Sequence, residues 1–283
     1  MPSTTDYINQ LKTDKQNLVN NLVSKGVEAN NEETFTSLVP KVLEVKGAGE
    51  ENVVIDTSLY PTGNTGNSNT FINSMITKIS RIDTSKWTDF RRLFYNLINL
   101  EEIPLLDSSN STNLNETFYN CSKIKTIPQF NTNNVTDLYS TFFGCTSLVT
   151  IPQLNTENVT RFYQTFSSCS SLTDVPLINA QKVHTIYYCF SGCKALKNVG
   201  GLKDLGKAFN QKSANHYNHK VDFSACTNLT YDSLMNIINN LYDLNVTYGG
   251  TLYTQQLVLG STNMAKLTSS ELELATSKGW SVS

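Results

Sequence analysis

The central part of the amino-acid sequence repeats with a period of 24 residues. An aliphatic residue followed by proline recurs at this spacing, in Ile103-Pro104, Ile127-Pro128, Ile151-Pro152 and Val175-Pro176. A phenylalanine precedes each of these positions, and its column runs one unit further: Phe94, Phe118, Phe142, Phe166 and Phe190. A regular period of this length indicates a stack of similar coils, in which each coil contacts only its neighbours.

Apolar residues hold fixed positions within each unit. Three residues after the phenylalanine comes a column rich in cysteine, and three residues later comes an aliphatic column. The first contains Leu97, Cys121, Cys145, Cys169 and Cys193, and the second contains Leu100, Ile124, Leu148, Leu172 and Leu196. The spacing predicts that every coil sends these side chains inward, where the next coil buries them. A degenerate first coil is expected near residues 71–93.

The period also indicates the type of coil. It falls within the range of roughly 20 to 29 residues that is typical of leucine-rich repeats, and proline suits the end of a short strand. The Asn- and Thr-rich segments 131–136 and 155–160 supply turn residues, so asparagine ladders are expected along the turns. We therefore predict an α/β leucine-rich-repeat solenoid that is β-rich, with 24-residue coils, a helical N-terminal module and a helix-bearing C-terminal cap.

One stretch of the repeat carries a family resemblance. The sequence Thr-Phe-Phe-Gly-Cys-Thr-Ser-Leu-Val-Thr-Ile-Pro-Gln-Leu-Asn-Thr-Glu-Asn-Val-Thr, residues 141–160, resembles the BspA-like leucine-rich repeats of bacterial and phage surface proteins. The resemblance covers roughly residues 71–230. Repeat arrays of this kind present extended binding surfaces, so we expect a binding protein and not an enzyme.

The C-terminal part is predicted to cover the open end of the stack, which would otherwise expose the apolar columns. Helical spacing predicts a helix whose apolar residues are Leu234, Ile237, Ile238 and Leu241. Thr268 and Glu271 have the pattern of a capping box at the start of a further helix, which ends near Gly279. The predicted divisions are therefore the solenoid, residues 71–205, and the C-terminal repeats and cap, residues 206–283.

Residues 1–46 are predicted to form a helical module. One helical stripe holds the apolar residues Ile8, Leu11, Leu18 and Leu22, and it fits either a trimeric coiled coil or two helices that pack on each other. Residues 6–29 and 33–43 resemble the N-terminal module of tail and baseplate proteins from phages of Gram-positive bacteria. The resemblance implies that residues 1–46 serve virion attachment or oligomerisation. A linker rich in Gly, Asn, Ser and Thr is expected at residues 47–70.

Charge and hydropathy argue against several classes of partner. The formal net charge of −2 and the pI of about 5.9 provide no basic field for phosphates, so nucleic acid is not an expected partner. No window of 18 apolar residues occurs, so membrane insertion is not expected either. The first residues lack a basic segment followed by an apolar one, so we expect assembly in the host cytoplasm, where thiols stay reduced.

No catalytic or metal-binding motif is recognisable in the sequence. His216 and His219 lie in a polar insertion without a carboxylate cluster, which favours a solvated loop over a metal site. The inward position of the cysteine column predicts buried free thiols, and a disulfide between stacked coils is sterically conceivable but disfavoured in a reducing compartment. We therefore expect no enzyme activity, no cofactor and no metal.

A column of tyrosines is the candidate ligand site. Tyr139, Tyr163 and Tyr187 follow a buried column directly, which places them at the surface. Their rings can stack on sugar faces while the hydroxyls form hydrogen bonds, or the rings can stack on one another along the edge of the coils. The predicted polar neighbours of this column are Asp137, Arg161, Gln164 and Tyr188.

Together these features favour a phage tail, baseplate or fibre protein that is located in the virion and helps to recognise the host. Its expected partners are other tail or baseplate proteins and a glycan or protein of the host cell surface, and the coiled-coil alternative implies a homotrimer. A bacterial surface adhesin or a protein-interaction scaffold of the same repeat family is the alternative.

Overall fold

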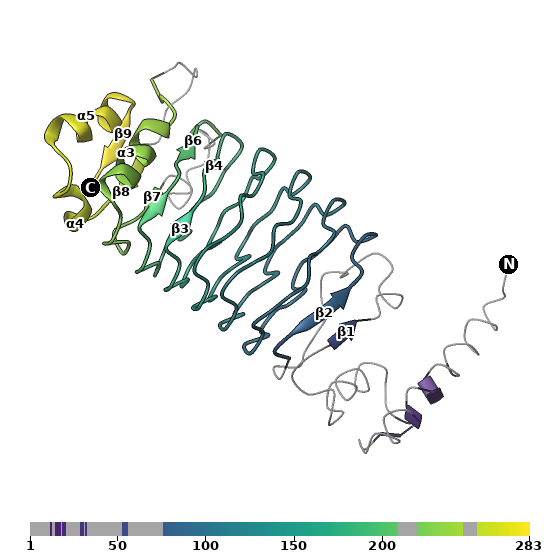
Figure 1. Ribbon diagram of the computed structural model, residues 1–283. Helices are drawn as coiled ribbons and strands as arrows, with labels where there is room; N and C mark the ends of the chain where they lie inside the picture. Colours follow the sequence, from purple (N-terminus) through teal and green to yellow (C-terminus); the bar gives the residue numbers. More distant parts are fainter. Residues whose placement is uncertain are drawn as a thin grey trace.

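The computed structural model describes residues 12, 15–17, 19–20, 29–30, 32, 53–55, 76–208, 220–245 and 254–283. Within this part of the chain, successive coils stack along one axis, and a C-terminal group of helices and strands covers the last coil (Figure 1). The predicted helical stripe and the predicted histidine loop lie outside the described residues, namely Ile8, Leu11, Leu18, Leu22, His216 and His219.

Parallel pairing between residues 24 positions apart holds neighbouring coils together. Single-residue parallel bridges link, in turn, Asp89, Asn113, Asp137, Arg161 and Thr185. Short parallel strands continue the register near the end of the stack: β3 (Asp174–Val175) with β5 (Asn198–Val199), and β4 (Ile178–Asn179) with β6 (Leu202–Lys203). The coils therefore keep a constant register, whereas the leucine-rich-repeat class stays a prediction.

An additional strand precedes the first predicted coil. β1 (Val53–Ile55) pairs in parallel with β2 (Ile79–Ile82), with a register shift within the pair. The range predicted as a linker, residues 47–70, thus contains a strand. Both isoleucines that bound β2 are buried, and so are Trp87 and Phe90, in agreement with an apolar first coil in this region.

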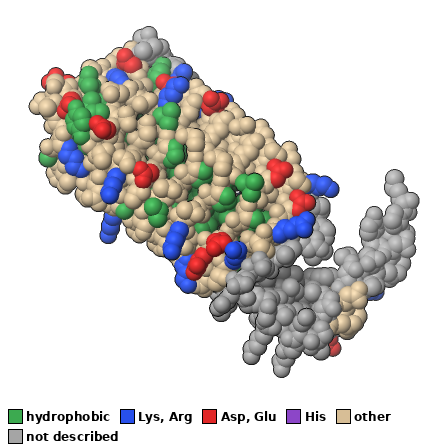
Figure 2. Space-filling view, viewed as in Figure 1, with side chains coloured by type: hydrophobic (Ala, Val, Ile, Leu, Met, Phe, Trp, Pro, Cys, Tyr) green, Lys and Arg blue, Asp and Glu red, His purple; other side chains and the backbone are tan. Residues whose placement is uncertain are grey.

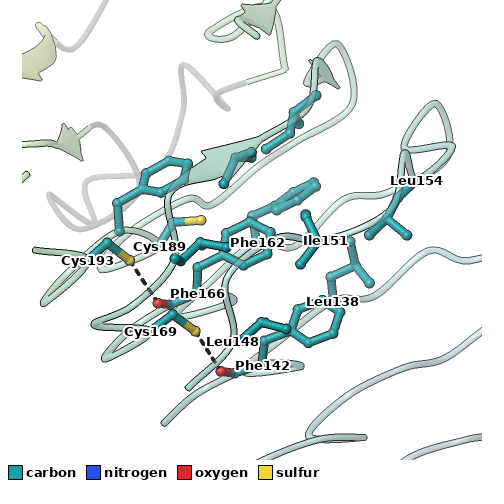
Figure 3. Packing of buried hydrophobic residues seen from close by; sticks show 14 of the residues in the cluster. Leu138, Phe142, Leu148, Ile151, Leu154, Phe162, Phe166, Cys169, Cys189 and Cys193 are labelled. Atoms are coloured by element: carbon teal, nitrogen blue, oxygen red, sulfur yellow. Dashed lines mark hydrogen bonds between the residues drawn. The ribbon is translucent and has the colours of Figure 1, made fainter. Parts of the chain in front are cut away.

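The predicted inward columns form the core of the stack (Figure 3). The phenylalanine column is at most 1% exposed, and its rings stack from coil to coil. The centroid of the Phe142 ring lies 5.5 Å from that of Phe118 and 5.7 Å from that of Phe166. The cysteine and aliphatic columns are equally buried. This burial is what binds the coils into one body, because a single coil would leave its apolar side in water.

Hydrogen bonds from thiols join the coils inside the core. Cys169 Sγ donates to the carbonyl oxygen of Phe142, and Cys193 Sγ donates to that of Phe166, each at 3.0 Å (dashed lines in Figure 3). Cys121 makes the same contact with the preceding coil. All six cysteines are buried and free, so the predicted buried thiols are confirmed. The hydrogen bond gives these residues a role beyond that of small apolar filler.

Two positions in each coil adopt a left-handed backbone conformation. The first position, with φ between 49° and 57°, is held by Arg92, Glu116, Ser140, Gln164 and Tyr188. The second position is held by Asn96, Asn120, Gly144, Ser168 and Gly192. This conformation costs a residue other than glycine about 1 kcal/mol. Hydrogen bonds to the next coil accompany these turns, and an example is the bond from Ser140 N to Tyr163 O at 2.9 Å.

Asparagine ladders run along the turns, as expected from the sequence. Asn110, Asn134 and Asn158 hold equivalent positions, and Nδ2 of each donates to a carbonyl oxygen of the preceding coil at 2.8–2.9 Å. These bonds give a partner to carbonyl groups in the turns that take no part in the regular pairing between coils.

Two helices in the C-terminal segment were predicted and are present. Helix α3 (Tyr231–Asn240) begins after the N-cap Thr230 and packs against β5 and β6 at the end of the stack. Helix α5 (Ser269–Ser277) begins with the predicted capping box, in which Thr268 and Glu271 exchange side-chain to backbone hydrogen bonds. Because α3 buries its apolar side on the last strands, the core does not end in water.

A parallel sheet completes this cap (Figure 1). Its order is β7 (Lys220–Asp222), β8 (Gln255–Val258) and β9 (Trp280–Val282). The short helix α4 (Ser261–Met264) follows β8. Trp280 is 2% exposed, and its indole nitrogen donates to the carbonyl oxygen of Tyr242 at 3.0 Å. This hydrogen bond therefore joins β9 to the segment that follows α3.

Candidate ligand-binding surface

The predicted tyrosine column lies on one side of three successive coils. Parallel bridges two residues ahead of each tyrosine fix the backbone. The ring centroids of Tyr139 and Tyr163 lie 5.2 Å apart with nearly parallel planes, and those of Tyr163 and Tyr187 lie 6.2 Å apart with a tilt of 41°. All three side chains are partly exposed. The rings therefore stack on one another, which is the second of the two alternatives.

A second aromatic column occurs four positions later in the coil, and the sequence reasoning missed it. Tyr95, Tyr119 and Phe143 stack with centroid distances of 4.8 and 4.7 Å. The available signal was an aromatic residue directly after the buried phenylalanine in three successive units. The two columns share one coil, because Tyr139 and Phe143 are four residues apart. We call the six residues of both columns the aromatic band.

An arginine lies over the first ring of each column. The guanidinium of Arg161 is 5.5 Å from the centre of the Tyr139 ring, and that of Arg92 is 5.2 Å from the centre of the Tyr95 ring. Each arginine also forms an ion pair with the neighbouring coil, and the pairs are Arg161–Asp137 and Arg92–Glu116. The ion pairs hold the guanidinium groups in place beside the rings, so both columns begin with the same fixed cationic group.

Two groups of this surface, Arg92 and Tyr119, have a raised pKa. The hydrogen bond to Glu116 raises the pKa of Arg92 above its ordinary value. Burial raises the pKa of Tyr119. Both shifts favour the protonated form, which is the form already present at neutral pH. The neutral ring of Tyr119 and the guanidinium of Arg92 therefore suit apolar, hydrogen-bonding and cation–π contacts.

The remaining predicted residues, Gln164 and Tyr188, hold the left-handed position next to the band. The ring centroid of Tyr188 lies 3.8 Å from that of Tyr187, and the residue is 42% exposed. Gln164 Oε1 accepts a hydrogen bond from Ser140 Oγ at 3.5 Å. All seven residues predicted for the site are therefore brought together, and Tyr188 is the exposed ring among them.

The surface around the coils is mainly neutral. Figure 2 shows uncharged polar side chains and backbone over most of the visible face, with basic and acidic side chains spread singly or in small groups. Among the described residues, no group of three or more His, Cys, Asp and Glu side chains is placed to hold a metal ion. The described helices are all too short or too polar to cross a membrane.

The sequence of the repeats matches the model of a known protein family. The family model described as "Mycoplasma protein of unknown function, DUF285" matches residues 65–149, 88–204 and 112–229. The second and third matches begin one coil apart (112 − 88 = 24), and the three together span more than half of the 283-residue chain. No curated protein and no solved structure matches the chain. The chain therefore belongs to the DUF285 family, a family of BspA-like repeats.

Proposed function

We propose that the chain is a structural protein of a phage tail or baseplate that presents a leucine-rich-repeat surface for recognition of a host receptor. The observation that carries this proposal is the aromatic band, six stacked rings held by successive coils. Tyrosine combines a large apolar area with a hydroxyl and is enriched among the residues that dominate binding energy. Because stacking already fixes these rings, they lose little conformational entropy when a ligand binds.

The place in the virion rests on residues 1–46, whose sequence resembles the N-terminal modules of phage tail and baseplate proteins. In this proposal they bind other tail proteins, and the coils meet a glycan or protein of the host surface. The test is immunogold labelling of purified virions with an antibody against residues 254–283. Label at the tail is expected. A chain found in the cell envelope and missing from virions would reject the role.

A surface adhesin or interaction scaffold of the same repeat family is the second candidate. The description of the family, which refers to mycoplasma proteins, favours a protein that serves the cell itself. Cell fractionation without phage induction separates the two. An adhesin would be produced by uninduced cells and recovered with their envelope, whereas a tail protein would accumulate only after induction.

The substitution Tyr188→Ala tests the exposed side of this surface, where Tyr188 packs against Tyr187 of the aromatic band. It removes an exposed ring and leaves the core intact, so we expect adsorption to host cells to fall by roughly tenfold while the melting temperature hardly changes. Tyr231→Ala is the matched control, because Tyr231 is 47% exposed and lies on α3, outside the band. It should adsorb normally. If Tyr188→Ala and Tyr163→Ala proteins that are shown to be folded both adsorb like the wild type, the band is not the receptor site.

A further inference from the structure

A groove with a volume of about 910 Å³ crosses several coils, and no residue of the aromatic band lines it. It is formed by the residues directly after the Ile-Pro or Val-Pro position and by the first residues of the asparagine turn. Two columns with a 24-residue spacing run through the groove, and we call it the amide groove after them. The first contains Leu105, Gln129, Gln153 and Leu177, and the second contains Asp107, Asn131, Asn155 and Asn179. The charged residues Glu157 and Lys203 also line it.

Glutamine amides form a ladder in the first column. Gln129 Nε2 donates to the carbonyl oxygens of Phe130 and Gln153, at 3.2 and 2.9 Å. Gln153 Nε2 makes the equivalent pair of bonds to Leu154 and Leu177, at 2.9 and 3.0 Å. These bonds use both hydrogens of each amide, and none of the described residues donates to either Oε1 atom. Each glutamine therefore retains an acceptor, repeated at the coil spacing of about 4.8 Å.

The second column adds donors. Asn131 Oδ1 accepts a hydrogen bond from the backbone nitrogen of Asn133 at 2.8 Å, which orients the amide. Within the described part of the chain, Nδ2 of Asn131 has no acceptor. The same backbone contact orients Asn155, whose Oδ1 accepts from Glu157 N at 3.0 Å. Its Nδ2 donates to Asn133 Oδ1 at 2.9 Å, so one of its two amide hydrogens is left over. Acceptors and donors thus lie in neighbouring columns of one groove.

A hydroxyl in the lining lacks the partner that its equivalents have. Thr84, Ser108 and Thr156 hold the same position in other coils, and each donates to a carbonyl oxygen of the next coil at 2.7–3.1 Å. Thr132 Oγ1 has no hydrogen bond, although Thr132 is only 3% exposed and lines the groove. A buried hydroxyl without a partner is unfavourable, so a shift of the lining that lets a ligand reach this covered oxygen would add a bond that the free protein does not make.

We infer that the amide groove binds a linear, uncharged glycan that lies along the stack. Sugar hydroxyls both donate and accept, which matches the mixed amide groups, and a chain of similar sugars matches a groove of similar coils. The two leucines at the ends of the first column are 70% and 42% exposed and can pack against the CH faces of the sugars. A peptide strand repeats its backbone groups about every 6.8 Å, which does not fit the coil spacing.

The test is titration of the full-length chain with maltohexaose, cellohexaose and chitohexaose by isothermal titration calorimetry. We expect at least one hexasaccharide to bind, and more tightly than its trisaccharide, because each further coil adds the same contacts. If none binds at about 10 mM, a concentration that detects even Kd values in the millimolar range, the inference is wrong. Binding of an extended peptide or of an anionic polymer in place of every neutral glycan would also overturn it.

Variants tie the binding to the groove. Leu105→Ala/Leu177→Ala is expected to weaken hexasaccharide binding roughly tenfold, about 1.4 kcal/mol. The matched control is Ile98→Ala/Val149→Ala, which truncates apolar residues of 45% and 41% exposure outside the groove. It should bind within about twofold of the wild type. Equal affinities of the two double variants would place the glycan elsewhere. This outcome is independent of virion labelling and of Tyr188→Ala, so the proposed function stands or falls separately.

Discussion

The thiols of the core show how a single residue type is adapted to its place in the coil. Burial raises the pKa of all six cysteines above the ordinary value, and that of Cys226 to about 12. A thiolate in this position would lose its hydration without gaining a positive partner. It would also lose the donor that the protonated thiol supplies to the carbonyl oxygen of the preceding coil, as Cys145 does to Phe118.

Stability should therefore fall at alkaline pH. Below the ordinary thiol pKa of 9.0 the cysteines are protonated in both states, so they add no pH dependence. Above it the unfolded chain loses thiol protons that the folded chain keeps, so the free energy of unfolding decreases until the folded pKa is reached, at about 12 for Cys226. The slope approaches about 1.4 kcal/mol per pH unit for each such thiol. Urea unfolding at a series of pH values from about 8 to about 11 measures it.

Cys226→Val provides the control, because it replaces the thiol by a small apolar side chain that does not titrate. Its stability should fall less steeply than that of the wild type over the same alkaline range, after any constant difference at neutral pH is subtracted. Parallel curves for the two proteins would mean that Cys226 does not contribute.

For single residues, the position of the side chain in the coil can be predicted from the sequence in some cases and not in others. The inward position of Cys169 follows from its column, because 24-residue spacing alone places it. Cys189 could not be placed in this way, since it occupies a column that otherwise holds Thr117, Thr141 and Thr165. The ladder of Tyr95 and its partners was missed because a partly exposed aromatic column looks like an ordinary extension of the buried one before it.

Among the elements, helix α5 owes its start to a reciprocal cap. Thr268 Oγ1 accepts from the backbone nitrogen of Glu271 at 3.3 Å, and Glu271 Oε2 accepts from the backbone nitrogen of Thr268 at 2.7 Å. Thr268→Ala removes one of these bonds and should lower the free energy of unfolding by about 1 kcal/mol, measured by urea denaturation. Thr276→Ala, the same change near the other end of α5, should be neutral or slightly stabilising because alanine has the higher helix propensity. A similar loss in both variants would argue against a specific capping effect.

Local signals explain why α3 and α5 were predictable while the turns were not. A helix cap and the spacing of apolar residues in a helix can each be recognised from a few adjacent residues. The left-handed positions, by contrast, carry Arg92, Glu116 and Gln164, which do not favour that conformation. Their backbone is determined by closure of the coil and pairing with its neighbours.

For the whole molecule, the important property is that coils interact only with adjacent coils. Thr136 N donates to Thr112 O, and Thr160 N donates to Thr136 O, both at 2.9 Å. Removal of one complete unit, residues 136–159, would bring Thr160 to the position of Thr136 and allow it to bond Thr112 instead. The phenylalanine, cysteine and aliphatic columns would remain continuous across the new junction.

We therefore expect the protein without residues 136–159 to fold cooperatively, with a lower free energy of unfolding because one interface between coils is lost. Its urea m-value should fall as well, since less surface is exposed on unfolding. Removal of half a unit, residues 136–147, is the control: it deletes fewer residues but shifts every later column out of register, so polar side chains would point inward and the chain should not fold. Circular dichroism with urea denaturation of both proteins decides the matter. If the shorter deletion were tolerated better than the complete unit, the shared register of the coils would not be what holds this molecule together.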